Sequence, residues 1–329
     1  MLIANCTFRA QIVDHDKAGP MKAARILRFG PPDVIVIDQL PRPQPGDGQL
    51  LVRVKAAGVG PWDALIREGK SAVSPPLPMT LGSDFAGVVE GMGPGVSGFA
   101  IGDEIYGATN EQFTGAYAEY TVASAEMSAP KPKTLNFVES ASAPVIAVTA
   151  WQMLFDYAHA TAGQTVLIHG GAGNVGAYAV QLARNAGLRV TATASADDAD
   201  YVSKLGADEV VNYKSVRFED VVHAVDIVLD SVGGETRERS FRVLKPGGIL
   251  VSVVSPIPQE TATRYNVKAV FFLVQVTTAR LRLVADLFES GKLVPCVGSV
   301  LPLEQARAAH EMLAGAPHPR GKIVLKIAG

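Results

Sequence analysis

A glycine-rich turn between a strand-like segment and a helix-like segment constrains this 329-residue chain more than any other feature. The apolar run 165–169 leads into Gly-Gly-Ala-Gly-Asn-Val-Gly at 170–176, and a helical pattern follows over 177–184. In this context Gly-x-Gly-x-x-Gly predicts a site for the phosphates of a dinucleotide. Gly171 permits the tight turn, Gly173 lets the backbone approach the pyrophosphate, and Gly176 lets the helix pack closely on the strand.

The helix that follows the turn strengthens this prediction, because a helix start offers free N–H groups and the positive end of a dipole to an anion. A structural turn that binds no ligand is the alternative interpretation. The candidate phosphate-binding residues are Gly171, Ala172, Gly173, Asn174, Val175 and Gly176.

Strands and helices alternate around this turn. After a helix over 144–157, we expect strands at 165–169, 189–193, 209–212, 226–230 and 248–254, with helices at 175–185, 198–205 and 236–243. This alternation predicts an α/β fold with a doubly wound parallel sheet, and the cofactor at the carboxyl ends of its strands.

The preceding part of the chain is strand-like and rich in turns, with alternating runs at 50–56 and 85–90 and frequent glycine and proline. It predicts a β-barrel-like region. Beyond residue 277 we expect a helix (281–289), a strand (293–300), a helix (303–313) and a final strand (322–327), which complete that first region. The expected organisation is an extension at 1–20, a discontinuous β domain at 21–143 and 277–329, and a dinucleotide-binding domain at 144–276.

The composition of the chain argues against several classes of function. The chain carries 30 basic and 32 acidic residues for a net charge of −2, which argues against nucleic acid or a membrane surface as the partner. No run approaches the ~18 apolar residues of a membrane span. The N-terminal segment lacks the apolar core of a secretory signal. The whole chain has two cysteines, Cys6 and Cys296, which are too few for a disulfide framework. We therefore expect a cytoplasmic protein that acts on a small molecule.

Several ordered motifs resemble one family. They are Gly-Val-Gly-Pro-Trp-Asp at 58–63, Leu-Gly-Ser-Asp-Phe-Ala-Gly-Val-Val at 81–89, Gly-Asp-Glu-Ile-Tyr-Gly at 102–107, Ala-Tyr-Ala-Glu-Tyr at 116–120 and Arg-Gly-Lys-Ile-Val-Leu at 320–325. Together with the glycine turn they resemble the zinc-independent, zeta-crystallin-like quinone oxidoreductases of the medium-chain dehydrogenase/reductase superfamily. The resemblance implies a GroES-like β-barrel catalytic domain, a Rossmann domain, cytosolic homodimers or homotetramers, and reduction of quinones or activated alkenes by NADPH.

Zinc needs separate treatment, because zinc-dependent alcohol dehydrogenases share this architecture. A catalytic zinc takes three protein ligands and keeps one open position. The zinc branch carries Cys and His at the positions that hold Gly60 and Ser83 here. His169 ends the first strand of the parallel sheet, where we expect a hydrogen-bonded packing role. The residues therefore predict no metal site.

The choice between NADP(H) and NAD(H) depends on the residues about 20 positions beyond the turn, where NAD-binding folds place an acidic side chain. Ala194 and Ser195 stand there, so no carboxylate repels a 2′-phosphate and NADP(H) is favoured. Tyr213 occupies a position where the family packs a tyrosine near that phosphate. Asp197 and Asp198 follow where relatives often carry a basic residue, which keeps NAD(H) open as the second candidate.

The resemblance also implies residues around the nicotinamide and the substrate. The expected cofactor contacts are Thr149, Ser231, Val232, Phe271 and Phe272. The expected substrate-pocket residues are Gly60, Trp62, Asp63, Leu65, Tyr106 and Tyr117. Relatives commonly carry Asn in place of Gly60 and Tyr in place of Leu65, so we expect a roomier and less polar pocket. No nucleophilic constellation is apparent; the proton comes from solvent or from the hydroxyl of Tyr106 or Tyr117.

Two alternatives stay open. One is an enoyl-thioester or polyketide enoyl reductase on the same fold. The other is a crystallin-like protein that binds the cofactor without turnover.

Overall fold

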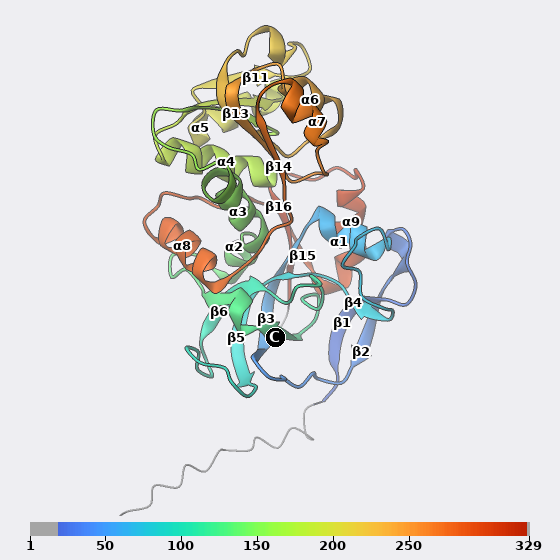
Figure 1. Cartoon of the computed structure of the whole chain (residues 1–329). Helices are drawn as coiled ribbons and strands as arrows, with labels where there is room; N and C mark the ends of the chain where they lie inside the picture. The colour runs from blue at the N-terminus through green and yellow to red at the C-terminus, as the bar shows by residue number, and fades with distance from the viewer. Residues whose placement is uncertain (1–18, 328–329) are drawn as a thin grey trace, which may run out of the picture.

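The computed structural model describes residues 19–327. It forms two lobes, and the C-terminal strands return to the lobe that contains the first strands (Figure 1). The predicted extension at 1–20, together with Cys6 and His15, lies almost wholly outside the described residues.

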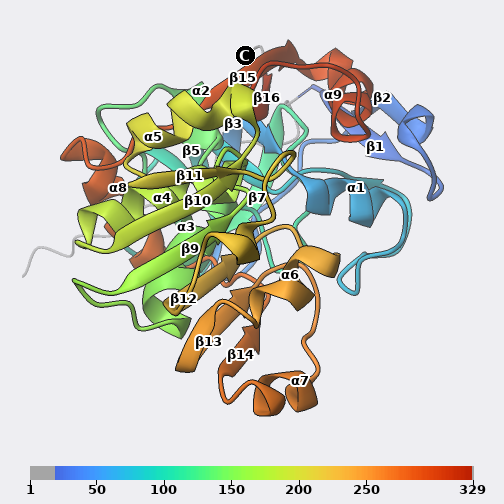
Figure 2. The same ribbon diagram turned by 90° about the horizontal axis from the view of Figure 1, so that it is seen from above.

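The predicted parallel sheet is confirmed. Its strands lie side by side in the order β11-β10-β9-β12-β13-β14, all parallel (Figure 2). This order is that of a Rossmann fold. The strands are β9 (Thr165–His169), β10 (Arg189–Ala194), β11 (Glu209–Asn212), β12 (Val225–Asp230), β13 (Leu244–Ser252) and β14 (Lys268–Phe271).

The first four helices of this domain start close to where the sequence predicts them, and the fifth, α7, was not predicted. They are α3 (Pro144–Trp151), α4 (Asn174–Asn185), α5 (Ala199–Leu205), α6 (Gly234–Ser240) and α7 (Gln259–Arg264). The expected single helix over 144–157 changes to a π-helix at Gln152–Tyr157, where the Gln152 side chain accepts a hydrogen bond from the backbone of Gln275.

Both faces of the parallel sheet are covered. Val166 and Ile168 belong to an apolar cluster with Val180 of α4, whereas Leu167, between them, belongs to a second cluster with Phe241. This alternation is what a period of two residues requires of a strand that is buried on both sides.

The other domain is built mainly from antiparallel strands. One sheet has the order β15-β16-β3-β5-β6-β8, with β7 also paired to β3, and a smaller sheet has the order β2-β1-β4. The strands are β1 (Met21–Ile26), β2 (Ile35–Leu40), β3 (Gln49–Val59), β4 (Met79–Thr80), β5 (Asp84–Met92), β6 (Glu104–Ala108), β7 (Tyr120–Ser124), β8 (Ser128–Pro130), β15 (Val297–Pro302) and β16 (Lys322–Lys326). The helices are α1 (Pro61–Arg67), α2 (Phe137–Ala141), α8 (Thr278–Glu289) and α9 (Ala306–Leu313).

The C-terminal strand β16 lies antiparallel to β3 of the first part of the chain, with Ile323 opposite Val59. The expected strand at 293–300 is wrong at its start, because β15 begins only at Val297. The side chain of Gln181 binds both the N–H and the C=O of Val294, so these groups are not available to a strand partner.

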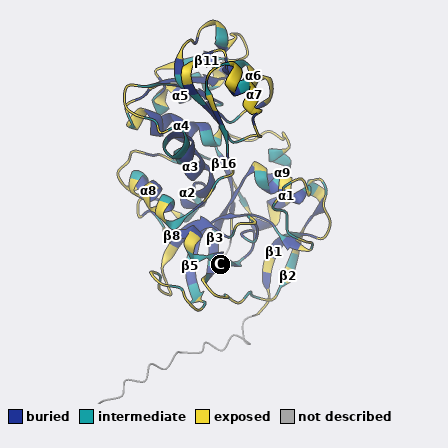
Figure 3. Ribbon diagram, in the orientation of Figure 1, coloured by how far each residue is buried: buried dark blue, intermediate teal, exposed yellow. Residues whose placement is uncertain are grey.

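One of the hydrophobic clusters spans the two domains. A single cluster contains Ala86 and Tyr106 of the antiparallel sheet, Val145 of α3 and Phe288 of α8. Figure 3 shows this buried material between the lobes. Within residues 19–327, no helix is both long and apolar enough to cross a membrane.

We predict that Gly176→Ala destabilises the protein while Gly173→Ala does not. A Cβ at 176 overlaps the backbone carbonyl oxygen of Gly170, whereas a Cβ at 173 meets only that oxygen, at 3.2 Å. Overpacking against backbone costs about 2 kcal/mol. Thermal unfolding of the two variants measures the difference, and equal melting temperatures would contradict the close-packing role of Gly176.

Candidate functional site: a dinucleotide turn at the domain junction

The glycine turn lies at the carboxyl end of β9, and three hydrogen-bonded contacts hold its shape. Gly171 N–H donates to the carbonyl of Thr193 at 2.9 Å, Gly173 N–H donates to that of Gly170 at 2.9 Å, and Gly170 N–H donates to the hydroxyl of Thr193 at 3.1 Å. The left-handed residue is Gly170, with φ of +73°, so the prediction that Gly171 provides the turn is corrected. Gly171 is required for another reason: a Cβ there lies 2.9 Å from that of Ala192.

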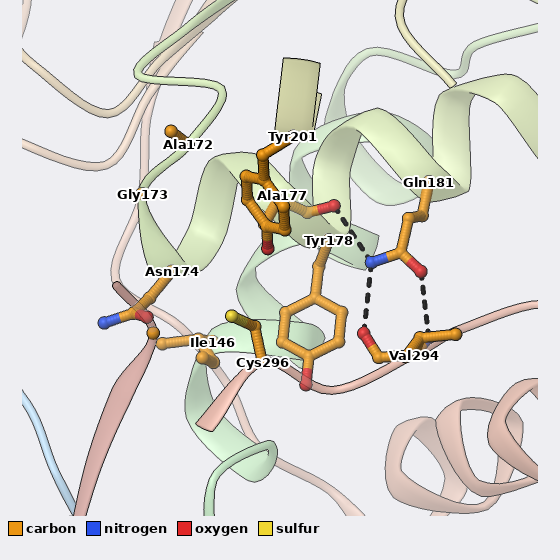
Figure 4. A pocket seen from close by; sticks show the side chains of 11 residues that line it. Ile146, Ala172, Gly173, Asn174, Ala177, Tyr178, Gln181, Tyr201, Val294 and Cys296 are labelled. Atoms are coloured by element: carbon orange, nitrogen blue, oxygen red, sulfur yellow. Dashed lines mark hydrogen bonds between the residues drawn. The ribbon is translucent and has the colours of Figure 1, made fainter. Parts of the chain in front are cut away.

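The start of α4 fits a phosphate. Gly173 is its N-cap, and no side chain in the described part of the chain caps it, so its first N–H groups face outward. A small hollow beside this end is lined by residues of both domains, among them Ala172, Gly173, Asn174, Tyr201 and Cys296 (Figure 4). The glycine cradle and the uncapped helix start therefore suit a pyrophosphate group.

The predicted ribose-binding residues lie together at the end of β10. Ala194 is its last residue, and its carbonyl accepts a hydrogen bond from the backbone N–H of Tyr213 at 3.2 Å. The side chain of Tyr213 is exposed. The hydroxyl of Ser195 donates to Oδ2 of Asp198 at 2.7 Å. Asp198 is thus held against the end of β10 instead of extending freely into solvent.

The predicted nicotinamide contacts differ in accessibility. The Thr149 hydroxyl donates back to the carbonyl of Val145 at 2.7 Å, and the Ser231 hydroxyl donates to that of His169 at 2.9 Å. Val232 is exposed and Phe271 is half-buried, so both are open to a ligand.

Phe272, unlike Val232 and Phe271, is not accessible to a ligand. It is buried and stacked on Tyr157, with ring centroids 4.3 Å apart. Its environment is the core.

At the start of α1, the indole of Trp62 fills space that the sequence predicted to be empty. Its N–H donates to the hydroxyl of Ser83 at 3.0 Å, and Nζ of Lys322 lies 4.2 Å from the ring centroid. A side chain at position 60 would overlap the ring, so Gly60 is what allows this rotamer. The expectation of a roomier pocket is therefore wrong at Gly60. Leu65 is exposed.

Asp63 does not face a pocket, because its side chain is fully buried. Its Oδ2 accepts hydrogen bonds from the backbone N–H of Gly60 at 2.8 Å and from the hydroxyl of Tyr117 at 2.9 Å. Burial raises the pKa of Asp63 to about 7, against the lowering effects of the Gly60 hydrogen bond and the charge of Lys322. Asp63 therefore fixes the loop that carries Trp62.

The two tyrosines suggested as proton donors are fully buried as well. Tyr106 donates its hydroxyl to the carbonyl of Leu281 at 2.6 Å, and Tyr117 donates to Asp63. Burial raises the pKa of both hydroxyls well above the usual value. This geometry corrects their placement in the substrate pocket.

His169 packs as the sequence suggests. Its Nε2 lies 2.9 Å from the hydroxyl of Ser240, and burial lowers its pKa to about 4. Within residues 19–327, no group of three or more His, Cys, Asp or Glu side chains is arranged to hold a metal ion.

Sequence analysis missed two cationic residues. Lys322 is buried and pairs with Asp84 at 3.1 Å. Arg320 reaches Asp198 in the other domain. Both belong to the Arg-Gly-Lys-Ile-Val-Leu motif at 320–325. A basic residue just before or at the start of an apolar strand is the sequence signal that could have identified them.

A Rossmann domain with this turn, joined to an antiparallel barrel, defines a nucleotide-dependent dehydrogenase or reductase of the alcohol dehydrogenase type. Two family descriptions match the chain, "Alcohol dehydrogenase GroES-like domain" over residues 46–133 and "Zinc-binding dehydrogenase" over residues 205–325.

Individual proteins narrow the class. Quinone oxidoreductase of Mus musculus is 33% identical, with 93% of this chain and 97% of that protein covered. The chloroplastic NADPH-dependent alkenal/one oxidoreductase of Arabidopsis thaliana is 32% identical, with 93% and 79% covered. The solved quinone oxidoreductase of Coxiella burnetii superposes with a TM-score of 0.88 at 34% identity, covering 94% and 100%. The chain belongs to the quinone oxidoreductase family of the medium-chain dehydrogenase/reductase superfamily.

We predict that Asp63→Asn flattens the dependence of stability on pH. The folded-state pKa of Asp63, about 7, exceeds its ordinary value of 3.8, so the folded state holds a proton that the unfolded state releases between these values. Stability from this group is complete below the ordinary pKa and is lost as pH rises to about 7, by about 1.4 kcal/mol per pH unit.

Denaturant unfolding of wild type and Asp63→Asn across this pH range measures the effect. The matched control is Asp47→Asn, because Asp47 is exposed. Parallel pH profiles for wild type and Asp63→Asn would contradict the assignment.

Proposed function

We propose that this chain is an NADPH-dependent oxidoreductase that reduces quinones or activated alkenes (enones and enals) without zinc. The single observation that supports the proposal most is the uncapped start of α4 behind the 170–176 turn, since its free N–H groups suit a phosphate at the junction of the two domains. The names of the relatives, quinone oxidoreductase and alkenal/one oxidoreductase, supply the acceptor class.

The reaction needs little covalent chemistry from the chain. When bound, the nicotinamide supplies the hydride; the protein provides binding, orientation and exclusion of water. Residues at the turn hold the phosphates, while Thr149, Ser231, Val232 and Phe271 border the nicotinamide. The indole of Trp62, held by Ser83 and Lys322, forms an apolar wall toward a flat acceptor.

The zinc-free part of the proposal rests on the ligand set. Gly60 and Ser83 stand where the zinc branch carries Cys and His, and the Trp62 ring bridges the two positions. Glycine offers no donor atom, and a neutral serine hydroxyl is not among the N and S ligands that zinc prefers.

Further features are proposed by family resemblance. They are a cytoplasmic location, a homodimer or homotetramer, and the domain boundaries 21–143 with 277–329 and 144–276. The pairing of β16 with β3 supports these boundaries. Light scattering of the purified chain measures the oligomeric state.

We expect the purified chain to oxidise NADPH when a benzoquinone, a naphthoquinone, an enal or an enone is added. A panel that also contains an enoyl thioester separates the alternatives. Turnover of the thioester alone identifies an enoyl-thioester reductase. Cofactor binding with no turnover across the panel identifies a non-catalytic binding protein and sinks the reductase proposal.

We also expect this turnover to survive chelation. Exhaustive dialysis against a strong zinc chelator should leave kcat and KM unchanged, because no zinc ligand set is present among the described residues. Elemental analysis of the same sample provides the control. Stoichiometric zinc, with activity that falls on its removal and returns on its addition, would refute the zinc-free mechanism.

A further inference from the structure

An arginine of the β domain crosses to the Rossmann domain beside the cofactor site. Arg320 precedes β16, and its Nε donates to Oδ1 of Asp198 at 2.6 Å; a terminal guanidinium nitrogen pairs with the same oxygen. The guanidinium also lies over the ring of Tyr201, 4.4 Å from its centroid. This ion pair therefore links segments 122 residues apart in the sequence.

Asp198 is shared between this arginine and the end of β10. Its other oxygen, Oδ2, accepts from the hydroxyl of Ser195, the residue directly after that strand. Asp198 lies three residues beyond Ser195, and its hydrogen bond to Ser195 brings its carboxylate to the end of β10, where dinucleotide folds place either an acid for the ribose 2′-hydroxyl or an arginine for a 2′-phosphate. Here both kinds of side chain are present and are bound to each other.

The positive charge of Arg320 offsets the negative charge of Asp198. Burial alone would raise the pKa of Asp198, but hydrogen bonds from Ser195 and Arg320 and the charges of Arg320 and Lys214 outweigh burial and lower it. Asp198 is therefore ionised at neutral pH. An ionised Asp198 attracts a hydroxyl donor and repels a phosphate, whereas Arg320 attracts a phosphate.

We propose that Asp198 and Arg320 form an exchangeable pair that sets the choice between NADPH and NADH. Arg320 leaves Asp198 to bind the 2′-phosphate of NADPH, while Asp198 accepts a hydrogen bond from the 2′-hydroxyl of NADH. The 2′-phosphate must compete with Asp198 for the arginine, so the pair reduces the preference for NADPH that a free arginine would give. This inference rests on the proposed function, because it presumes a nicotinamide dinucleotide at the turn.

The test measures binding rather than turnover. Isothermal titration of wild type, Arg320→Gln and Asp198→Asn uses NADPH, NADH, adenosine 2′,5′-bisphosphate and 5′-AMP as probes. We expect Arg320→Gln to weaken NADPH and the bisphosphate by about tenfold or more, with NADH and 5′-AMP changed less than about twofold. Asp198→Asn should tighten NADPH and the bisphosphate and weaken NADH.

Two further variants separate recognition from structure. Arg320→Lys keeps the positive charge and should retain most of the preference for the bisphosphate. Arg307→Gln breaks a comparable exposed pair, Arg307 with Glu311 on α9, and should leave all four affinities unchanged. Melting temperatures of every variant report any loss of folding.

The outcomes are distinguishable. An equal loss of NADPH and NADH affinity in Arg320→Gln would show that the arginine only holds the two domains together, and unchanged affinities would show that it does not contact the cofactor. Either result overturns the exchangeable pair while the proposed function stands. A wild-type chain that binds neither nucleotide refutes the proposed function itself.

Discussion

Two oppositely charged side chains, Asp84 and Lys322, are buried against each other where three distant stretches of the chain meet. Asp84 begins β5, Lys322 begins β16, and the remaining oxygen of Asp84 accepts a hydrogen bond at 3.1 Å from the backbone N–H of Val145 in α3. The pair therefore joins the antiparallel sheet, the returning C-terminal strand and the first helix of the Rossmann domain. Burial raises the pKa of Asp84 while the charge and hydrogen bond of Lys322 lower it. Removing one partner from such a pair leaves an uncompensated buried charge, which is the costly event.

The surroundings of this pair include Trp62, which we propose as a wall of the substrate region. Lys322 also lies over the indole of Trp62, which is held in turn by Ser83. Gly60 and Ser83 thus act together: the first leaves room for the ring and the second anchors its N–H. An aromatic wall with a cation behind it stands where the zinc branch of the superfamily places metal ligands. Arg320 precedes the strand that begins with Lys322, so one short segment supplies both the cation beside Trp62 and the arginine that pairs with Asp198.

Much of the fold could be predicted from the sequence because its determinants are local. The alternation of apolar strands with amphipathic helices specified the parallel sheet, and β9 and β11 have the expected bounds. The spacing of glycines predicted a phosphate site at the turn. The predictions failed where a distant side chain intervened. Val294 is outside β15 because Gln181, on α4, takes its backbone groups. Tyr106 and Tyr117 look like accessible hydroxyls in sequence, but packing buries both.

By itself, the sequence predicted the class of site: glycine at 173 and 176 before a helix, no carboxylate at 194 and 195, and no zinc ligand at 60 and 83. Each of these depends on the chemistry of a residue at a fixed offset from its neighbours, which a linear pattern contains. Only the tertiary structure decided that Gly170 is the left-handed residue, that Trp62 folds over Gly60, and that Arg320 reaches Asp198. The positions of the Trp62 ring and of the Arg320 guanidinium are side-chain placements. Arg320 meets Asp198 because strand pairing and burial bring together residues that are far apart in the chain. A local sequence pattern does not contain that information.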